Sequence, residues 1–129
     1  MPKTKKTILI VDDEAPMLEA LSSKFKNKGF KTIEAADGEE GLAAALSNRP
    51  DLILLDIIMP KIDGMTVMKK IREDKKWGQD VPIIMLTNLD DPESVSEAAS
   101  YKVFDFLVKT DWRLEDIAKL VEDKLDIMN

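Results

Sequence analysis

Short apolar segments alternate with longer amphipathic stretches along the whole chain. The apolar segments are rich in Val, Ile and Leu and cover residues 7–11, 32–35, 52–55, 81–86 and 104–108. Continuous apolar runs of this length, with many β-branched or aliphatic residues, are typical of parallel strands that are buried on both faces. The pattern therefore predicts five buried parallel strands.

The stretches between these segments have the spacing of amphipathic helices. In the first stretch Leu18, Leu21 and Phe25 recur at helical spacing, with Pro16 suited to the first turn and Gly29 to the end. Further helices are predicted at residues 38–46, at 65–71 as part of a third, from 91 through 99, and from Thr110 or Asp111 as N-cap onward. Five strands that alternate with five helices predict an α/β fold with a doubly wound, five-stranded parallel sheet.

Length and composition fit one domain and exclude several functions. A chain of 129 residues, 44% of them apolar, can fill one core, so we expect a single domain over residues 1–129 with a core at about 7–127. Without cysteine the chain has no disulfide or zinc knuckle, which favours an intracellular protein. Without histidine it can carry neither a hydrolase triad nor a phosphohistidine.

The charge balance bears on partners and location. A formal charge of −6 disfavours a broad basic surface for nucleic acid. The sequence has no apolar stretch long enough for a signal peptide or a membrane span. We therefore expect a cytoplasmic protein without membrane contact or direct nucleic-acid binding.

Five polar residues stand at the ends of the apolar segments: Asp12, Asp13, Asp56, Thr87 and Lys109. The carboxyl ends of parallel strands meet at one edge of a sheet, where α/β folds bind their ligands. Clustered carboxylates repel one another unless a cation neutralises them, and hard oxygen ligands suit Mg²⁺. The pattern therefore predicts a site for a divalent cation and a phosphoryl group.

Each of these residues also has a purely structural interpretation. One aspartate could cap a helix and the other face solvent, Thr87 could cap the next segment, and Lys109 could be an ordinary surface lysine. Any one of these interpretations would be reasonable by itself. Five polar groups at the same edge of one sheet favour the functional interpretation.

With these motifs, the chain resembles the receiver domains of two-component response regulators, including the stand-alone chemotaxis type. The resemblance covers almost the whole chain and rests on residues 8–13, 54–64, 81–87 and 104–109. It implies a flavodoxin-like receiver fold. It also implies that Asp56 is the phosphoacceptor, which attacks the phosphorus of a phosphohistidine on a partner kinase.

The resemblance implies roles for the other site residues as well. Asp13, Asp56 and the backbone carbonyl of Ile58 would ligate Mg²⁺, with Asp12 holding a metal-bound water. Thr87 and Lys109 would bind phosphoryl oxygens. Thr87 and Phe106, the position of the aromatic switch, would then convert the charge change into a change of surface shape.

The expected partners follow from the same resemblance. They are a histidine kinase or phosphotransfer protein and a downstream protein target, with the chain as a monomer or a phosphorylation-dependent homodimer. We expect no DNA-binding or enzymatic output domain in this chain. We expect it to catalyse only its own phosphotransfer and slow autodephosphorylation.

Three other functions fit the sequence less well. A degenerate receiver would bind proteins without phosphorylation, but all five expected groups are present. A Mg²⁺-dependent aspartyl-phosphate phosphatase would resemble Asp-x-Asp at its nucleophile, whereas Ile58 stands at the second acidic position. A flavin carrier would need a phosphate-binding loop after the first strand, where the acidic residues 12–14 would repel phosphate.

Some positions differ from the commonest family pattern. Lys102 and Val103 stand where Gly-Ala is common, so we expect a differently built turn before the last strand. Asn88 stands where a small residue is frequent, and Thr110-Asp111 replaces the usual proline after the lysine. None of these differences removes a required group.

Overall fold

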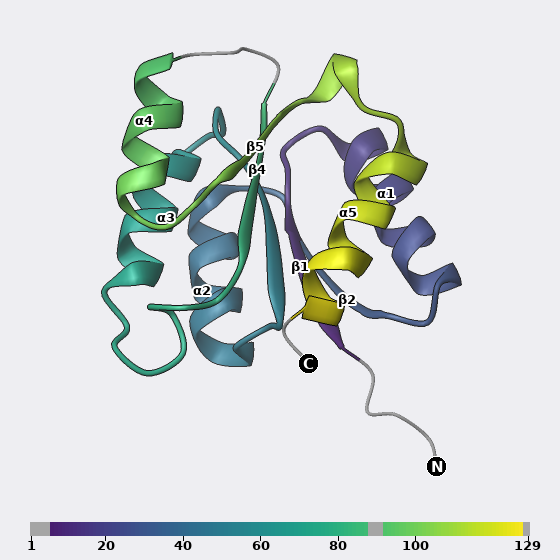
Figure 1. Ribbon diagram of the computed structural model, residues 1–129, viewed down its shortest axis with the longest axis horizontal. Helices are drawn as coiled ribbons and strands as arrows, with labels where there is room; N and C mark the ends of the chain where they lie inside the picture. Colours follow the sequence, from purple (N-terminus) through teal and green to yellow (C-terminus); the bar gives the residue numbers. More distant parts are fainter. Residues whose placement is uncertain (1–5, 88–91, 128–129) are drawn as a thin grey trace.

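The computed structural model describes residues 6–87 and 92–127, which form one α/β sandwich (Figure 1). The strands are β1 Thr7–Val11, β2 Lys31–Ala35, β3 Leu52–Asp56, β4 Ile83–Thr87 and β5 Asp105–Val108. All neighbouring pairs are parallel, in the order β2-β1-β3-β4-β5. The predicted doubly wound, five-stranded sheet is therefore confirmed.

Helices cover both faces of the sheet. They are α1 Ala15–Asn27, α2 Gly38–Asn48, α3 Gly64–Arg72, α4 Pro92–Ser100 and α5 Leu114–Ile127. Figure 1 shows α1 and α5 on one face and α2, α3 and α4 on the other. Among the described residues, no helix has both the length and the apolar character needed to cross a membrane.

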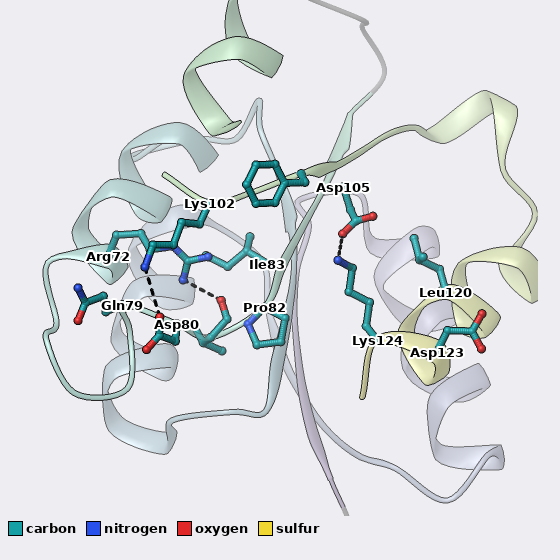
Figure 2. A pocket seen from close by; sticks show the side chains of 12 residues that line it. Arg72, Gln79, Asp80, Pro82, Ile83, Lys102, Asp105, Leu120, Asp123 and Lys124 are labelled. Carbon is teal, nitrogen blue, oxygen red and sulfur yellow. Dashed lines mark hydrogen bonds and ion pairs between the residues drawn. The ribbon is translucent and has the colours of Figure 1, made fainter. Parts of the chain in front are cut away.

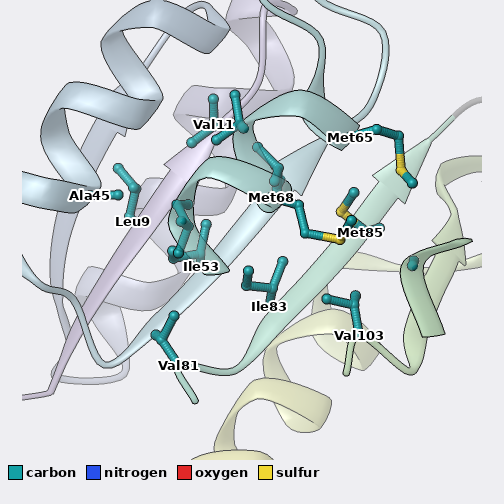
Figure 3. Packing of buried hydrophobic residues seen from close by; sticks show 14 of the residues in the cluster. Leu9, Val11, Ala45, Ile53, Met65, Met68, Val81, Ile83, Met85 and Val103 are labelled. Carbon is teal, nitrogen blue, oxygen red and sulfur yellow. The ribbon is translucent and has the colours of Figure 1, made fainter. Parts of the chain in front are cut away.

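The alternating side chains of the strands build two separate cores. From β1, Ile8 and Ile10 point into the core beneath α1 and α5, while Leu9 and Val11 point into the core beneath α2 and α3. Figure 3 shows the second core, where Met68 of α3 lies over the strands. Because both faces are buried, the central strands β1, β3 and β4 are apolar at almost every position, and the polar residue at or directly after the end of each marks the edge of the sheet.

Several element boundaries differ from the sequence prediction. The strands β4 and β5 begin at Ile83 and Asp105, later than predicted, and Phe104 is 74% exposed. Neither Thr110 nor Asp111 is the N-cap of α5, since residues 109–111 form a 3₁₀ turn and α5 begins at Leu114. The turn carries the chain from Lys109 at the sheet edge to the outer helix. Asn88 and the predicted start of the fourth helix at residue 91 lie outside the described residues.

The turn before β5 is built on a left-handed residue. Lys102 has φ +65°, a conformation that glycine adopts without strain. Val103 follows it into the core, with only 2% of its surface exposed. Lys102 thus takes the left-handed conformation that the commoner glycine would favour, and the expectation of a differently built turn stays a prediction.

Candidate functional site

The strand register brings the five predicted polar residues to one edge of the sheet. Asp56 and Thr87 are the last residues of β3 and β4, and Thr87 pairs with Val108 of β5. Asp12 and Lys109 directly follow β1 and β5. Asp12, Asp56 and Thr87 are 1%, 4% and 2% exposed. Polar side chains this deeply buried need partners of opposite charge or hydrogen bonds.

Three carboxylates gather at this edge. One oxygen from each of Asp12, Asp13 and Asp56 lies within 4.8 Å of the other two. Asp13 is exposed, while Asp12 and Asp56 are buried. Oxygen ligands at this spacing fit a hard divalent cation such as Mg²⁺, and the cluster reaches solvent through Asp13.

The ammonium of Lys109 lies among these acidic groups. Lys109 Nζ is 2.8 Å from Asp12 Oδ2, 2.6 Å from Glu14 Oε1 and 3.3 Å from Asp56 Oδ2. The lysine side chain is only 7% exposed. Charge neutralisation by this lysine is what allows Asp12 and Asp56 to remain buried side by side.

The environment changes the proton affinity of both central groups. Burial raises the pKa of Asp56 to about 6; Lys109 opposes this effect, while Asp12 and Asp13 reinforce it. Burial alone would lower the pKa of Lys109, but contacts with Asp12 and Glu14 and the charge of Asp56 raise it overall. At neutral pH, Asp56 is therefore mostly an anion beside a permanent cation.

Backbone contacts hold the loops that carry these groups. Asp12 Oδ1 accepts a hydrogen bond of 2.9 Å from the backbone N–H of Glu14. The N–H of Gly64 donates to the carbonyl of Ile57 at 2.7 Å, and Asp63 caps α3 by accepting from Thr66. The start of α3 is thereby fixed directly against the loop that follows Asp56.

The remaining predicted residues lie around this centre. Ile58 lies two residues after Asp56 and its side chain is 60% exposed. Phe106 pairs with Met85 in the sheet and is half-buried against the core beneath α3. Phe106 thus lies on β5, two residues before Val108, which pairs with Thr87. It is therefore set back along the strand from the carboxylates.

The sequence interpretation assigned no role at this site to Glu14. The structure places its carboxylate closest to Lys109 of the three acids that the lysine contacts. A signal for it was present, because Glu14 directly follows the aspartate pair in the sequence. The pattern of strand ends did not point to Glu14, since it lies two residues beyond the first polar position after β1.

Comparisons with known proteins agree with this geometry. Residues 8–122 match the family model of the response regulator receiver domain. A probable transcriptional regulator, ycf27 of Guillardia theta, is 41% identical over 107 residues, which are 83% of this chain and 41% of the relative. The chain thus spans less than half the length of that curated relative, as it does for ycf27 of Porphyridium aerugineum.

Solved structures give the same result at the level of the fold. A two-component response regulator from Clostridium difficile aligns with a TM-score of 0.86 and 31% identity, over 97% of this chain and 99% of that one. A CheY-like receiver domain protein from Methanospirillum hungatei aligns with a TM-score of 0.87 and 25% identity, over 95% of both chains. On sequence, fold and site geometry together, this chain belongs to the response regulator receiver domain family of two-component signalling.

Proposed function

We propose that this receiver accepts a phosphoryl group on Asp56. The observation that carries the proposal is the position of the Asp56 carboxylate: it is 4% exposed, lies 3.3 Å from Lys109 and shares a cluster with Asp12 and Asp13. Phosphoryl transfer depends mainly on positioning and charge neutralisation, and this edge supplies both.

The reaction needs no general base. One oxygen of Asp56 attacks the phosphorus of a phosphohistidine on the donor, a new O–P bond forms, and the P–N bond breaks with its electron pair left on the imidazole. Because Asp56 is mostly ionised at neutral pH, no proton has to leave it first. Lys109 lies beside the attacking carboxylate, with its Nζ 3.3 Å from Asp56 Oδ2. It would neutralise charge on the phosphoryl oxygens, with the Thr87 hydroxyl as a second donor.

The acidic cluster would hold Mg²⁺. Asp13, Asp56 and the backbone carbonyl of Ile58 are the proposed ligands, with Asp12 acting through a bound water; the close carboxylate oxygens support this set. When bound, the ion would supply positive charge next to the transferring group. Without a cation, the three carboxylates would carry more negative charge than the ammonium of Lys109 can neutralise.

The product adds roughly two negative charges at a buried edge. Thr87 lies at the end of β4, hydrogen-bonded in the sheet beside β5, which carries Phe106. Movement of Thr87 toward a phosphoryl group on Asp56 would shift the end of β4 and change the space available to Phe106. We propose these two residues as the switch that alters the surface around β5.

The proposal extends to partners. A histidine kinase or phosphotransfer protein would donate the phosphoryl group, and a protein target would read the changed surface. The single domain of residues 1–129 would act in the cytoplasm as a monomer or a phosphorylation-dependent homodimer. It would not contact nucleic acid or membrane itself, and its only catalysis would be its own phosphotransfer and slow autodephosphorylation.

Intact-mass spectrometry after incubation with acetyl phosphate tests the proposal. The wild type with Mg²⁺ should gain the mass of one phosphoryl group, while Asp56→Asn, or the wild type with EDTA, should gain none. A matched control is Asp51→Asn, because Asp51 lies at the opposite end of β3 and should leave the mass gain intact. A wild type that takes up no phosphoryl group would contradict the proposal and favour a receiver that binds its target without phosphorylation.

A further inference from the structure

Glu14 is the closest acidic partner of the lysine at the centre of the site. The Glu14 Oε1 to Lys109 Nζ distance is 2.6 Å, against 2.8 Å to Asp12 and 3.3 Å to Asp56. The Glu14 side chain is 49% exposed, whereas the other two carboxylates are almost completely buried. The ammonium is therefore shared between two interior carboxylates and one at the rim.

The Glu14 side chain contacts Lys109 and does not cap the helix that it precedes. Glu14 is the N-cap residue of α1, but its side chain makes no capping hydrogen bond. Its own N–H is held by Asp12 Oδ1 at 2.9 Å. Glu14 thus follows the aspartate pair in a fixed turn, with its carboxylate directed to Lys109 and outside the three-carboxylate cluster.

The contact has a consequence once Asp56 carries a phosphoryl group. An ammonium has three donors, and in this structure Lys109 donates hydrogen bonds to Glu14 and Asp56 and forms an ion pair with Asp12 Oδ2 at 2.8 Å. To donate to a phosphoryl oxygen, Lys109 must give up or weaken one of these contacts. The rim contact with Glu14 is the one that the reaction itself does not require.

We propose that Glu14 is a positioning residue that competes with the phosphoryl group for Lys109 and so slows phosphorylation of Asp56. The inference rests on the proposed phosphoacceptor function of Asp56. Glu14 holds the ammonium toward the rim before transfer and releases it as negative charge builds up on Asp56. Removing the competition should make Lys109 available earlier along the reaction.

The test compares phosphorylation rates by acetyl phosphate, followed by intact mass at a fixed Mg²⁺ concentration. Glu14→Gln removes the charge with little change of shape, and Glu14→Asp keeps the charge but shortens the side chain by one methylene. Glu19→Gln is the matched control, because Glu19 is an exposed acid on α1. We expect both Glu14 variants to react about three to ten times faster than the wild type, and the Glu19 variant within about twofold.

Salt separates competition for Lys109 from simple repulsion of the anionic donor. A repulsion effect at an exposed charge is screened between about 0.05 M and about 0.5 M KCl, whereas the contact of a lysine that is 7% exposed is screened much less. The proposal expects the faster rate of both variants to persist at high salt. An increase that disappears at high salt, or that Glu14→Asp does not show, would overturn it.

The outcomes also separate this inference from the proposed function. Phosphorylation of the wild type with unchanged rates in the Glu14 variants would overturn the role of Glu14 and leave Asp56 as the phosphoacceptor. No mass gain in the wild type or in any variant would overturn both proposals. Thermal unfolding of each variant checks that the fold is retained, which is expected because the Glu14 side chain caps no helix.

Discussion

The buried carboxylate of Asp56 makes the stability of the fold depend on pH. Its pKa is raised from 3.8 to about 6, mainly by burial. Between these two values the folded protein retains a proton that the unfolded chain has released, so the free energy of unfolding falls as the pH rises. Above about pH 6 this decrease in the free energy of unfolding is complete. In the absence of metal it amounts to at most about 3 kcal/mol, at about 1.36 kcal/mol per pKa unit.

We therefore expect Asp56→Asn to be more stable than the wild type at pH 7 by about 1 to 3 kcal/mol, because asparagine carries no charge to bury. The advantage should shrink steadily as the pH falls from 6 to 4. Urea unfolding in EDTA across this range measures it. A wild type that equals or exceeds the variant at pH 7 would show that Lys109 outweighs the burial of Asp56.

The left-handed backbone of Lys102 gives a second prediction. At φ +65° a residue with a Cβ is strained by roughly 1 kcal/mol, and glycine is not. Lys102→Gly should therefore be more stable than Lys102→Ala by about 1 kcal/mol. Both variants lose the exposed 3.4 Å ion pair with Asp80 equally, so their difference in urea unfolding isolates the backbone. Equal stability would contradict the strain.

The sequence predicted single residues best where one physical rule decided their position. The carboxyl ends of buried parallel strands must meet at one edge, so the order of residues alone was enough to place Asp12, Asp56 and Thr87 together. The contact between Glu14 and Lys109 depends on the path of the loop after β5 and on the rotamers of two long side chains. No periodicity in the sequence encodes either of these.

The junction between β3 and α3 depends on a glycine because two backbones approach closely. A Cβ on Gly64 would lie 2.1 Å from the carbonyl oxygen of Asp56 and 2.8 Å from Cα of Ile57. Both are backbone atoms that cannot rotate away. Gly64→Ala should therefore displace the loop that follows Asp56, the proposed phosphoacceptor, with a loss of about 2 kcal/mol of stability and at least about tenfold in phosphorylation rate.

Gly29→Ala provides the comparison for that variant. It is strained by a φ of +95°, yet a Cβ there would meet nothing within 4 Å, and Gly29 lies at the end of α1 that is distant from the site. It should lose stability without losing phosphorylation rate, measured well below both unfolding temperatures. Equal rates in the two variants would mean that the β3–α3 junction tolerates a Cβ without moving Asp56.

Arg72 joins three segments at the opposite edge of the sheet. Its guanidinium donates to the carbonyls of Tyr101, Gly78 and Val81 at 2.7–2.8 Å, beside a pocket of about 440 Å³ (Figure 2). Arg72→Met would leave these carbonyls without their donor and should cost about 2 to 4 kcal/mol. Lys70→Met, an exposed neighbour on α3, should change stability by less than about 0.5 kcal/mol in the same urea titration.

A small loss in Arg72→Met would show that water replaces the guanidinium. Since the pocket lies before β4 and β5, at the edge away from Asp56, we expect phosphorylation of Arg72→Met to proceed at the wild-type rate while the protein is folded. This result would separate the edge of the sheet that Arg72 stabilises from the edge that carries the proposed phosphoacceptor.

Whole elements were predicted well and their ends less well. Apolar runs identified the central strands β1, β3 and β4, because burial on both faces requires apolar side chains throughout. The apolar pattern did not locate the first residue of β5, because Phe104 is as apolar as the strand yet lies 74% exposed in the preceding turn. Nor did capping chemistry locate the start of α5, because the polar residues 110 and 111 belong to a 3₁₀ turn after Lys109.

Both cores of the molecule depend on the same five strands. Neighbouring residues of one strand, such as Leu54 and Leu55, enter opposite cores. Neither helical layer can therefore lose its packing without exposing strands that support the other. This arrangement predicts one cooperative unfolding transition, although the apolar clusters on the two faces are separate.

Phe25 and the two tryptophans make this testable. Phe25 is fully buried beneath α1 and α5, while Trp77 packs against the other core and Trp112, which is 37% exposed, lies between the 3₁₀ turn and α5. Phe25→Leu should lower the free energy of unfolding by about 1 to 2 kcal/mol. Measured in Trp77→Phe and in Trp112→Phe backgrounds, the single remaining tryptophan should report the same shift from either face. A shift seen only through Trp112 would mean that the α1 and α5 layer unfolds independently. The proposed phosphorylation site, which draws its residues from strands common to both cores, would then lose its support in two steps.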